Sequence, residues 1–353
     1  MPRLINSHHR SLPAKAMQGI NVEDVCIECN AVSRILQLRV ITCVFFVLSV
    51  KAVIHFFVTY GVYNYPHLPA EVLETQLYKQ ITPKLVLQTS KPECKYDEIL
   101  KSTSSLLNWE VPRKFDDFSA KGLVNGSYVP EHCNPKFSVA LIVAYRNRQS
   151  QLDVFLPYIH NFLRKQNIHY RIYLVEQQDE QTFNKGILLN VGAKTAIRDK
   201  FPCLILHDVD LLPLDASNLY ACANEPRHMS VSIDKFRFVL PYDYLAGGVL
   251  AVKSEQFVAV NGLSNRFEGW GGEDDDFSYR LSAHKFDVVR FPREMSRYTM
   301  LVHPQERRNS ARRRIMRETR QHGAGASDGL STLPYVSTSV QNHRLFTLVG
   351  VRL

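Results

Sequence analysis

The chain has 353 residues and a mass of 40.5 kDa, and 45% of its residues are hydrophobic and 22% charged. These values exclude a disordered or fibrous chain and are sufficient for one sizeable globular domain with extensions. The formal net charge is +9, but much of the basic excess lies in the N-terminal leader and in residues 307–320, and no other basic face is interleaved with aromatic residues. We therefore expect no nucleic-acid partner.

The first predicted element is a membrane-spanning signal anchor over residues 40–60. This stretch is apolar over about the twenty residues that a bilayer-spanning helix needs. Lys51 and His55 interrupt it, and a charge near the bilayer centre costs about 3 kcal/mol on insertion scales. The alternative is a buried helix of a protein core.

The charges around this stretch predict its orientation. Four basic residues precede it: Arg10, Lys15, Arg34 and Arg39. Little positive charge follows it closely. The positive-inside rule then makes residues 1–39 a cytoplasmic tail and places the bulk of the chain in a lumen. A cleaved signal peptide fits less well because a long tail precedes the apolar run. Residues 61–92 show weak periodicity, as a stem would, so we expect the compact domain over residues 93–353.

Two further patterns fit a lumenal domain. Asn125 begins an Asn-Gly-Ser sequon for N-glycosylation. Four cysteines outside the predicted anchor allow two disulfides: Cys94, Cys133, Cys203 and Cys222. Their spacing does not give the pairing, and a reduced, cytosolic domain stays open if the predicted anchor is wrong.

Strands and helices alternate from residue 137 onward. Continuous apolar and β-branched runs predict strands at 137–144, 170–175 and 203–206, and helical patterns lie between them at 152–163 and 184–199. This order predicts an α/β domain with a largely parallel sheet, in which ligands bind beyond the carboxyl ends of the strands.

Asp208 and Asp210 directly follow the third predicted strand. Alternate residues point the same way, so both carboxylates can converge on one ligand. Such a pair suits a divalent cation bound to a nucleotide diphosphate, because these cations prefer oxygen ligands. The alternative is a solvated turn with Asp caps, which is the commoner outcome for an isolated pair.

A second acidic group follows a glycine-rich aromatic turn in residues 267–276. Glycines let the backbone approach a ligand closely, and Trp270 offers a flat face for a sugar ring. Four consecutive acids cannot all relax in solution, so some must meet substrate or cation, or have a raised pKa suited to base catalysis. An acidic helix N-terminus explains part of the run, but it explains neither Trp270 nor the glycines.

Together with further short blocks, these residues resemble the beta-1,4-galactosyltransferase family from about Cys94 to the C-terminus. The blocks lie in order at 145–148, 183–184, 188–192, 208–210, 226–228, 234–236, 247–248, 269–276, Met300 with His303, and 327–330. The resemblance implies a GT-A fold behind a transmembrane helix, a type II Golgi membrane protein, a requirement for Mn²⁺, and inversion at the anomeric carbon.

The resemblance also implies roles for individual residues. Asp274 matches the catalytic base, which must remove a proton from the acceptor hydroxyl. The other implied roles are metal ligation by Asp210, Met300 and His303; donor binding by Arg146, Arg148, Phe183, Asp208, Lys235 and Gly248; sugar contacts by Trp270, Glu273 and Asp275; and the disulfides Cys94–Cys133 and Cys203–Cys222. A thioether and an imidazole favour Mn²⁺ or another transition ion over Mg²⁺.

The chain departs from the family pattern in three places. Glu268 stands where the family usually has Trp, and Ala144 replaces a common Pro. Residues 307–320, which correspond to a mobile loop in the family, are rich in arginine and share little identity with it. Because that loop helps to select the acceptor, the natural acceptor is not predicted.

The choice of donor depends, by the same resemblance, on the residue two before the Gly-Gly pair. Leu245 occupies this position instead of the Tyr of vertebrate members and leaves room for an N-acetyl group. We therefore expect transfer of GalNAc from UDP-GalNAc to the 4-OH of a terminal GlcNAc on a glycoprotein or glycolipid. The alternatives are UDP-Gal as donor, with Leu245 only packing, and a non-catalytic lumenal glycan-binding protein, against which the intact Asp210, Asp274, Met300 and His303 argue.

Overall fold

The structure is a computed structural model that describes residues 22–59, 62, 64–101, 119–304, 307–323, 328–334 and 337–353. The chain divides into two compact units, Met1–Thr59 and Tyr60–Leu353. Arg10 and Lys15, used above to orient the chain, lie outside the described residues.

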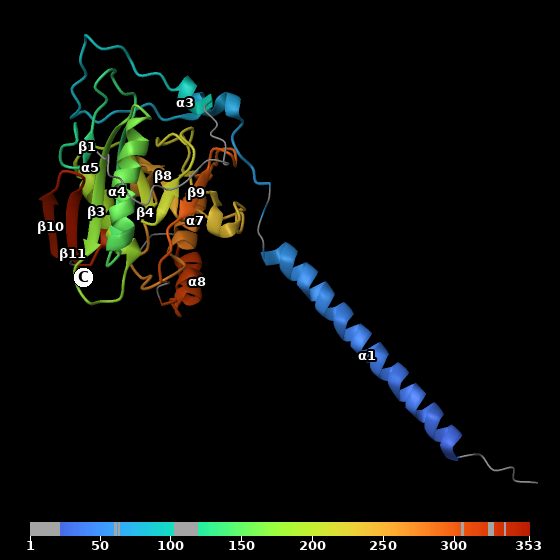
Figure 1. Cartoon of the computed structure of the whole chain (residues 1–353). Coiled ribbons are helices and arrows are strands. Elements are labelled where there is room, and N and C mark those ends of the chain that lie inside the picture. The colour runs from blue at the N-terminus through green and yellow to red at the C-terminus, as the bar shows by residue number, and fades with distance from the viewer. Residues whose placement is uncertain are drawn as a thin grey trace, which may run out of the picture. The chain divides into compact units, whose positions relative to one another are not determined.

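The first unit contains one long helix, α1 (Val22–Thr59), shown in blue in Figure 1. Its stretch Ser33–Phe56 has 24 residues with a mean hydropathy of 1.9, which is long and apolar enough to cross a membrane. None of that stretch is buried, so the alternative of a helix inside a protein core is not supported. The apolar stretch begins and ends earlier than residues 40–60, where we predicted the span.

The second unit is built on a mixed sheet in the order β10-β11-β3-β2-β4-β8-β6, with β1 paired to β3. Its strands are β1 (Ser127–Tyr128), β2 (Ser138–Tyr145), β3 (His169–Gln177), β4 (Cys203–Asp208), β6 (Arg227–His228), β8 (Val249–Lys253), β10 (Ser337–Asn342) and β11 (Thr347–Arg352). The three predicted strands correspond to β2, β3 and β4.

The sheet is parallel only at its centre, where β2 pairs with β3 and β4, and β11 pairs with β3. The pairs β4–β8, β6–β8, β10–β11 and β1–β3 are antiparallel. The prediction of a largely parallel sheet is therefore wrong beyond these strands. A parallel return needs a crossover, usually a helix, whereas residues 209–248 between β4 and β8 contain only short strands and one 3-10 turn.

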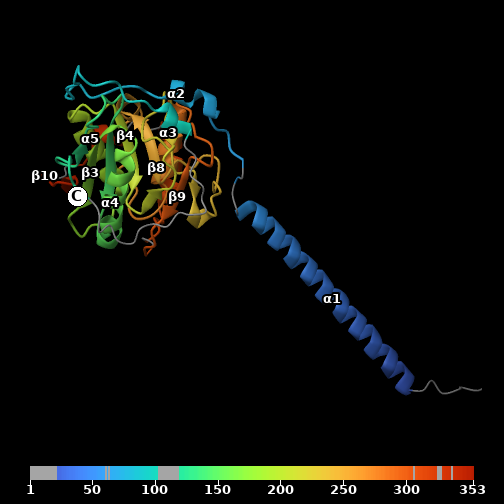
Figure 2. The same cartoon turned by 45° about the horizontal axis from the view of Figure 1, so that its top comes forward.

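Helices α4 (Gln149–Arg164) and α5 (Lys185–Arg198) cover opposite faces of the sheet (Figures 1 and 2). Residues of β2 alternate between two cores: Val139, Leu141 and Val143 pack in the core that contains α4, and Ala140 and Ile142 pack in the core that contains α5. Both helices confirm the predicted patterns at 152–163 and 184–199.

Gly192 allows α5 to approach the sheet closely. A Cβ added there would lie 2.4 Å from Cγ2 of Ile142 and 2.7 Å from Cγ2 of Val175. The helix is therefore fixed against β2 and β3, and its first residue, Lys185, is held at the carboxyl end of the sheet.

A smaller sheet continues from the end of β4. It has the order β5-β9-β7, with β5 (Leu211–Pro213), β9 (Arg297–Met300) and β7 (Ser232–Ile233). The remaining helices are η1 (Ala70–Val72), α2 (Leu73–Gln76), α3 (Asp97–Lys101), η3 (Asp234–Phe236), α6 (Ser254–Ala259), α7 (Glu273–Ala283), α8 (Arg312–His322) and η4 (Leu330–Thr332).

The segment that we expected to be a stem packs on this unit. Tyr65, Leu73 and Leu77 are buried, and Leu77 forms a β-bridge with Ala223. The compact unit begins at Tyr60, so the domain boundary predicted at residue 93 is too late. These apolar residues are widely spaced, which is why no periodicity revealed them.

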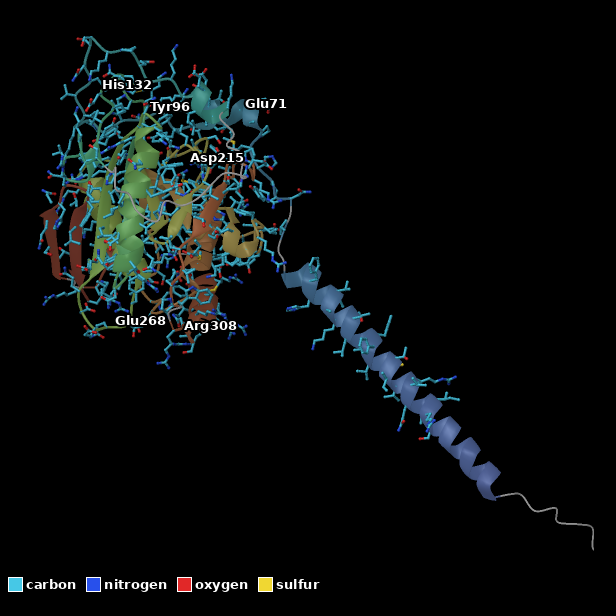
Figure 3. The ribbon with its side chains drawn as sticks, viewed as in Figure 1. Glu71, Tyr96, His132, Asp215, Glu268 and Arg308 are labelled. Atoms are coloured by element: carbon cyan, nitrogen blue, oxygen red, sulfur yellow. A yellow bond between two sulfur atoms is a disulfide. The ribbon has the colours of Figure 1, made fainter. Side chains whose placement is uncertain are left out.

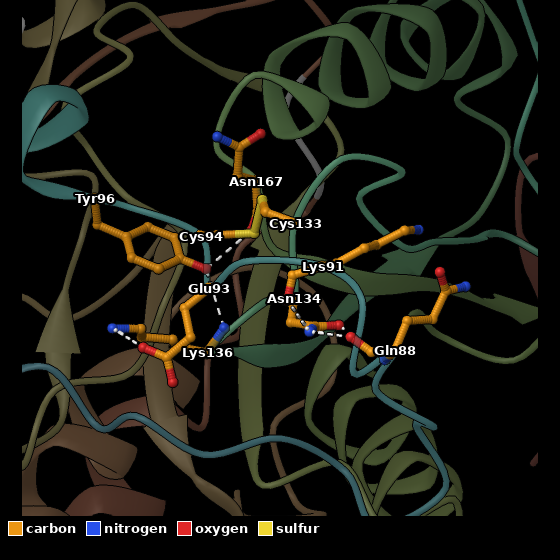
Figure 4. The surroundings of a disulfide bond; sticks show 9 residues. All are labelled: Gln88, Lys91, Glu93, Cys94, Tyr96, Cys133, Asn134, Lys136 and Asn167. Atoms are coloured by element: carbon orange, nitrogen blue, oxygen red, sulfur yellow. Dashed lines mark hydrogen bonds and ion pairs between the residues drawn. A yellow bond between two sulfur atoms is a disulfide. The ribbon is translucent and has the colours of Figure 1, made fainter.

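Two disulfides confirm the expected pairing, Cys94–Cys133 and Cys203–Cys222. Figure 4 shows the first, beside which Asn134 donates to the carbonyl oxygens of Gln88 (2.7 Å) and Lys91 (3.0 Å). In the chain-entropy model, loops closed by cysteines 39 and 19 residues apart contribute about 3 to 4 kcal/mol each to stability. Asn125 is exposed in the turn before β1, where a glycan would meet solvent.

Candidate active site

Strand β4 carries its polar residues to the junction between the two sheets. Asp208 is the last residue of β4, and Asp210 precedes β5. Between them the chain turns, and the Asp208 N–H donates to the Gly248 carbonyl oxygen (3.0 Å) while the Asp210 carbonyl oxygen accepts from the Leu301 N–H (2.7 Å). The two carboxylates thus lie at one strand end, as predicted, but they meet different partners.

Lys185 connects Asp208 to the acidic run. Its Nζ lies 2.9 Å from Oδ1 of Asp208, 3.3 Å from Oδ1 of Asp274 and 3.6 Å from Oε1 of Glu273. These carboxylates come from β4 and from the first turn of α7. One cation therefore holds together two segments that lie 65 residues or more apart in the sequence.

The electrostatics of this cluster follow from its burial. Burial alone would lower the pKa of Lys185, but the three carboxylates outweigh it and raise that pKa well above its ordinary value. Burial raises the pKa of Asp208 to about 6 despite the opposing charge of Lys185. Burial, with the charge of Asp274, raises the pKa of Glu273 to about 7. The cluster therefore holds more negative charge than one lysine neutralises.

The four consecutive acids have separate environments at the N-terminus of α7. Asp276 is buried and pairs with Arg280 (2.7 Å), and Asp275 accepts from the Tyr242 hydroxyl (2.8 Å). Oε2 of Glu273 is buried and has no hydrogen-bond partner among the described residues. The helix-terminus alternative is thus correct for Asp276, while Glu273 has an unused acceptor atom.

Gly247 fixes the position of Asp274. A Cβ at Gly247 would lie 2.4 Å from Oδ2 of Asp274, so this carboxylate packs directly on the backbone that leads into β8. Asp274 and Asp208 also line one small cavity together with Lys185 and Gly248. The predicted base and two predicted donor-site residues therefore share one site.

Asp210 contacts His303, one of the other two predicted metal ligands. Its Oδ2 lies 2.6 Å from Nε2 of His303, and this hydrogen bond raises the pKa of the His303 imidazole. Met300 ends β9, opposite Leu211, and its N–H donates to Oδ1 of Asp234 (3.0 Å). Within the described residues no three His, Cys, Asp or Glu side chains gather at one point, and Met300 is the third ligand that the resemblance implies. A carboxylate, an imidazole and a thioether fit a transition ion.

A cleft of about 470 Å³ opens beside these residues, lined by Asp234, Lys235 and residues 300–303. Lys235 is exposed in the turn η3. The structure therefore places the predicted donor residue Lys235 and the predicted ligands Met300 and His303 along one cleft, with Asp210 bonded to His303 at its side.

The arginines that follow β2 lie at the same end of the sheet. Arg146 donates to the Gln181 carbonyl oxygen (2.6 Å), and its guanidinium lies 5.2 Å from the centre of the Phe183 ring. Arg148 donates to the Pro304 carbonyl oxygen (2.9 Å), next to His303. Ala144 lies in β2 itself, where a Pro would be unable to donate to the ladder.

Leu245 lies apart from these groups. It is half-buried and packs against Tyr65, Val231 and Leu240, and it lines neither cavity described above. The structure thus gives Leu245 a packing role and does not bring it to the carboxylates.

Trp270 lies at the edge of the site under the arginine-rich segment. Trp270 is 44% exposed, and the guanidinium groups of Arg308 and Arg312 lie 5.6 Å and 5.8 Å from the centre of its ring. The Trp270 N–H donates to the Arg307 carbonyl oxygen (2.9 Å). Glu268 is exposed, and Figure 3 shows it near Arg308, at the end of the unit opposite Glu71 and His132.

Comparisons with known proteins identify the family. A family model described as the N-terminal region of glycosyl transferase group 7 matches residues 101–223, and one described as the N-terminal domain of galactosyltransferase matches residues 227–304. Beta-1,4-galactosyltransferase 4 of Cricetulus griseus is 36% identical over 256 residues, which are 71% of this chain and 74% of that protein. The chain belongs to the beta-1,4-galactosyltransferase family.

Other family members show how far the likeness extends. Beta-1,4-galactosyltransferase 1 of Bos taurus is 37% identical over 251 residues, which are 70% of this chain but 62% of that protein. The catalytic domain of Drosophila beta-1,4-galactosyltransferase 7, solved with xylobiose, is 27% identical and covers 62% of this chain and 94% of that one with a TM-score of 0.52. A mutant of it, solved with manganese, UDP-Gal and xylobiose, is 26% identical and covers the same shares with a TM-score of 0.53.

Sequence reasoning missed three residues that contact predicted site residues in the structure. Lys185 directly follows the recognised Phe183-Asn184 block, Asp234 begins another block, and Tyr242 precedes the Gly-Gly pair. The position of Lys185 directly after a recognised block could have indicated its role. Nothing in the sequence shows that Asp234 bonds to Met300 or that Tyr242 bonds to Asp275.

Proposed function

We propose that the chain is an inverting hexosyltransferase that moves a sugar from a UDP-sugar to the 4-OH of a terminal GlcNAc. The observation that carries this proposal is the convergence at the end of β4. Asp210 with His303 lies on one side of the turn, and Asp208 with Lys185 and Asp274 lies on the other. A site for a cation-bound diphosphate thus adjoins a carboxylate placed to accept a proton.

The proposed cofactor is Mn²⁺, held by Asp210, Met300 and His303. The mixed set of ligands favours a transition ion over Mg²⁺, and the Drosophila relative was solved with manganese and UDP-Gal. When bound, the ion supplies positive charge that stabilises the departing diphosphate. Arg146, Arg148 and Lys235, at the same end of the sheet, contribute further positive charge near it.

Asp274 is the proposed catalytic base. The acceptor hydroxyl must lose a proton as it attacks the anomeric carbon, and a general base typically contributes 10²-fold or more to the rate. Lys185 and Gly247 hold the carboxylate in place. Trp270, Glu273 and Asp275 are proposed to contact sugars, Glu273 through its unpartnered Oε2.

The donor is either UDP-GalNAc or UDP-Gal, and one observation supports each. By the resemblance, Leu245 occupies the position that selects the donor, and the lack of a hydroxyl there supports UDP-GalNAc, although Leu245 lines neither cavity of the site. The names of the relatives and the UDP-Gal complex of one of them support UDP-Gal. We favour UDP-GalNAc. Leu245→Tyr should then lower the ratio of GalNAc to Gal transfer by about tenfold. An unchanged ratio would favour UDP-Gal as the donor.

The proposed location is the Golgi membrane, as a single-pass type II protein with a lumenal catalytic unit. The apolar stretch of α1 and the two disulfides support it. Protection of the catalytic unit from protease in sealed vesicles, and a mass shift at Asn125 after glycosidase treatment, test this orientation.

Donor assays on the full chain test the function itself. We expect transfer to a GlcNAc-terminated acceptor with Mn²⁺, weaker transfer with Mg²⁺, and none in excess chelator. Full activity in chelator would contradict the metal site. If neither donor is used while GlcNAc glycans still bind, the chain is a non-catalytic glycan-binding protein.

A further inference from the structure

A strongly basic surface beside Trp270 is not used by the metal, donor and base roles proposed above. Residues 307–323 contain seven arginines and one glutamate. We call Arg308, Arg312, Arg313, Arg317 and Arg320 the arginine face. All of these except the half-buried Arg312 are exposed.

The geometry of α8 gathers three of these arginines on one side. Ile315 and Thr319 are buried and fix the inner side of the helix. Arg313, Arg317 and Arg320 follow one another at spacings of four and three residues, so they are neighbours on its surface. None of the three forms an ion pair with an acidic residue among the described parts of the chain.

The glutamate of the segment is engaged elsewhere. Glu318 pairs with Arg266 and with Arg314 (3.5 Å), which lies on a different side of α8 from the arginine face. The positive charge of Arg313, Arg317 and Arg320 is therefore not neutralised by the segment's own acid.

This arrangement is unfavourable for the helix alone. Like charges four residues apart destabilise a helix, and cations in its first turn oppose the helix dipole. Arg312, Arg313 and Arg314 occupy the first turn of α8, which contains no acid. A bound anion would relieve both repulsions.

The arginine face is continuous with the proposed acceptor residues. Arg308 and Arg312 lie over the Trp270 ring, and Arg320 lies 5.5 Å from the centre of the Tyr279 ring on α7. The charges of Arg312 and Arg320 also act on Asp275. An acceptor sugar on Trp270 would therefore extend toward these guanidinium groups.

We propose that the arginine face binds a sulfate or carboxylate group carried by the acceptor glycan, so that the enzyme prefers anionic acceptors. This inference rests on the proposed transferase function. Guanidinium groups bind both anions through paired hydrogen bonds. Because the face is exposed, the preference should weaken as ionic strength rises.

A membrane surface fits this face less well. A helix that lies on a membrane inserts an apolar side into the lipid. On α8 the buried Ile315 packs against the protein, and the described residues from 307 to 323 include no large exposed hydrophobic side chain.

The test compares two acceptors with the full chain in neutral detergent. One is a neutral GlcNAc-terminated disaccharide, and the other is the same disaccharide with a sulfate ester. We expect kcat/KM to be about tenfold higher for the sulfated acceptor at low salt, and the ratio to approach one near about 0.5 M salt. The triple variant Arg313→Gln, Arg317→Gln and Arg320→Gln should lose this ratio, whereas Arg314→Gln, on the same helix, should keep it.

A binding measurement separates this inference from the proposed function. Trp270 is one of two tryptophans in the chain, so binding of the sulfated disaccharide is followed by fluorescence without any donor. Tight, salt-sensitive binding that the triple variant loses supports the arginine face even if no transfer occurs. Equal kcat/KM values for the two acceptors, or a triple variant that keeps the ratio, would overturn it. So would an effect of anionic lipid on these arginines without an effect of the sulfated glycan.

Discussion

The acidic cluster around Lys185 and the arginine face differ in whether their charges are paired within the protein. In the cluster, three carboxylates surround one lysine whose side chain is 15% exposed. On α8, Arg313, Arg317 and Arg320 lie exposed and form no ion pair with an acid among the described residues. The difference shows where charge serves to position residues within the protein and where it is left available to a ligand.

Replacing Lys185 should destabilise the acidic cluster and is the largest effect that we expect. Lys185→Met leaves Asp208, Asp274 and Glu273 facing one another, and loss of one partner from a buried ion pair costs about 3 kcal/mol or more. Urea unfolding of the donor-free chain measures this loss. Lys194→Met, an exposed position on the same helix, is the control. Equal stability of the two variants would show that the cluster does not depend on Lys185.

Neutralising the proposed base tests what the cluster holds in place. Asp274→Asn should lower kcat by about 10²-fold because the general base is lost, while the affinity for UDP and Mn²⁺ changes little. The exposed Asp287→Asn serves as a control with no expected effect. A mutant that loses donor affinity at unchanged kcat would make Asp274 a donor-binding residue.

The pH dependence of the free energy of unfolding tests the environment of Glu273 in the acidic cluster. The pKa of Glu273 is raised to about 7, so the folded state binds its proton more tightly than the unfolded state does. The stability that protonated Glu273 contributes to the folded state is fully present below the pKa of the unfolded chain, and it is lost as the pH rises toward 7. Glu273→Gln should therefore gain about 1 kcal/mol or more relative to wild type between pH 5 and pH 8, measured by unfolding in chelator. A constant difference across this range would contradict the assignment.

The smallest effect is expected on α8. Arg313→Glu places an acid in the first turn and four residues before Arg317, which should stabilise the helix by about 0.5 kcal/mol. Hydrogen exchange of the α8 amides should slow by roughly twofold. Arg314→Gln, which breaks the pair with Glu318, should have the opposite sign. Faster exchange in Arg313→Glu would mean that the arginines are already neutralised in the free protein.

The sequence predicted the parts of the fold that depend on local patterns. Apolar runs located β2, β3 and β4, and the pair Asp208 and Asp210 marked the strand end where the site lies. The antiparallel return of β8 was not predictable, because its pairing with β4 joins residues about 45 positions apart without a periodic signal between them.

The same distinction between local patterns and long-range contacts applies to the site. The spacing of Met300 and His303 was visible in the sequence, and the structure places both along the cleft beside Asp210. The role of Lys185 was not visible, since it depends on two segments that meet only in the folded chain. Leu245 was singled out by its position in a block, and only the structure shows that it packs on Tyr65.

The packing of the segment before Cys94 also determines where a protease could release the second unit from the proposed membrane anchor. Leu73 and Leu77 are buried in the same core as β2 and α4, so cleavage near residue 90 would separate them covalently from the unit that they help to complete. Proteolytic release in an active, secreted form therefore requires a cut closer to α1, before Val62. N-terminal sequencing of the soluble protein shed from cells would locate that cut, and an active fragment that begins after Leu77 would show that this segment is dispensable.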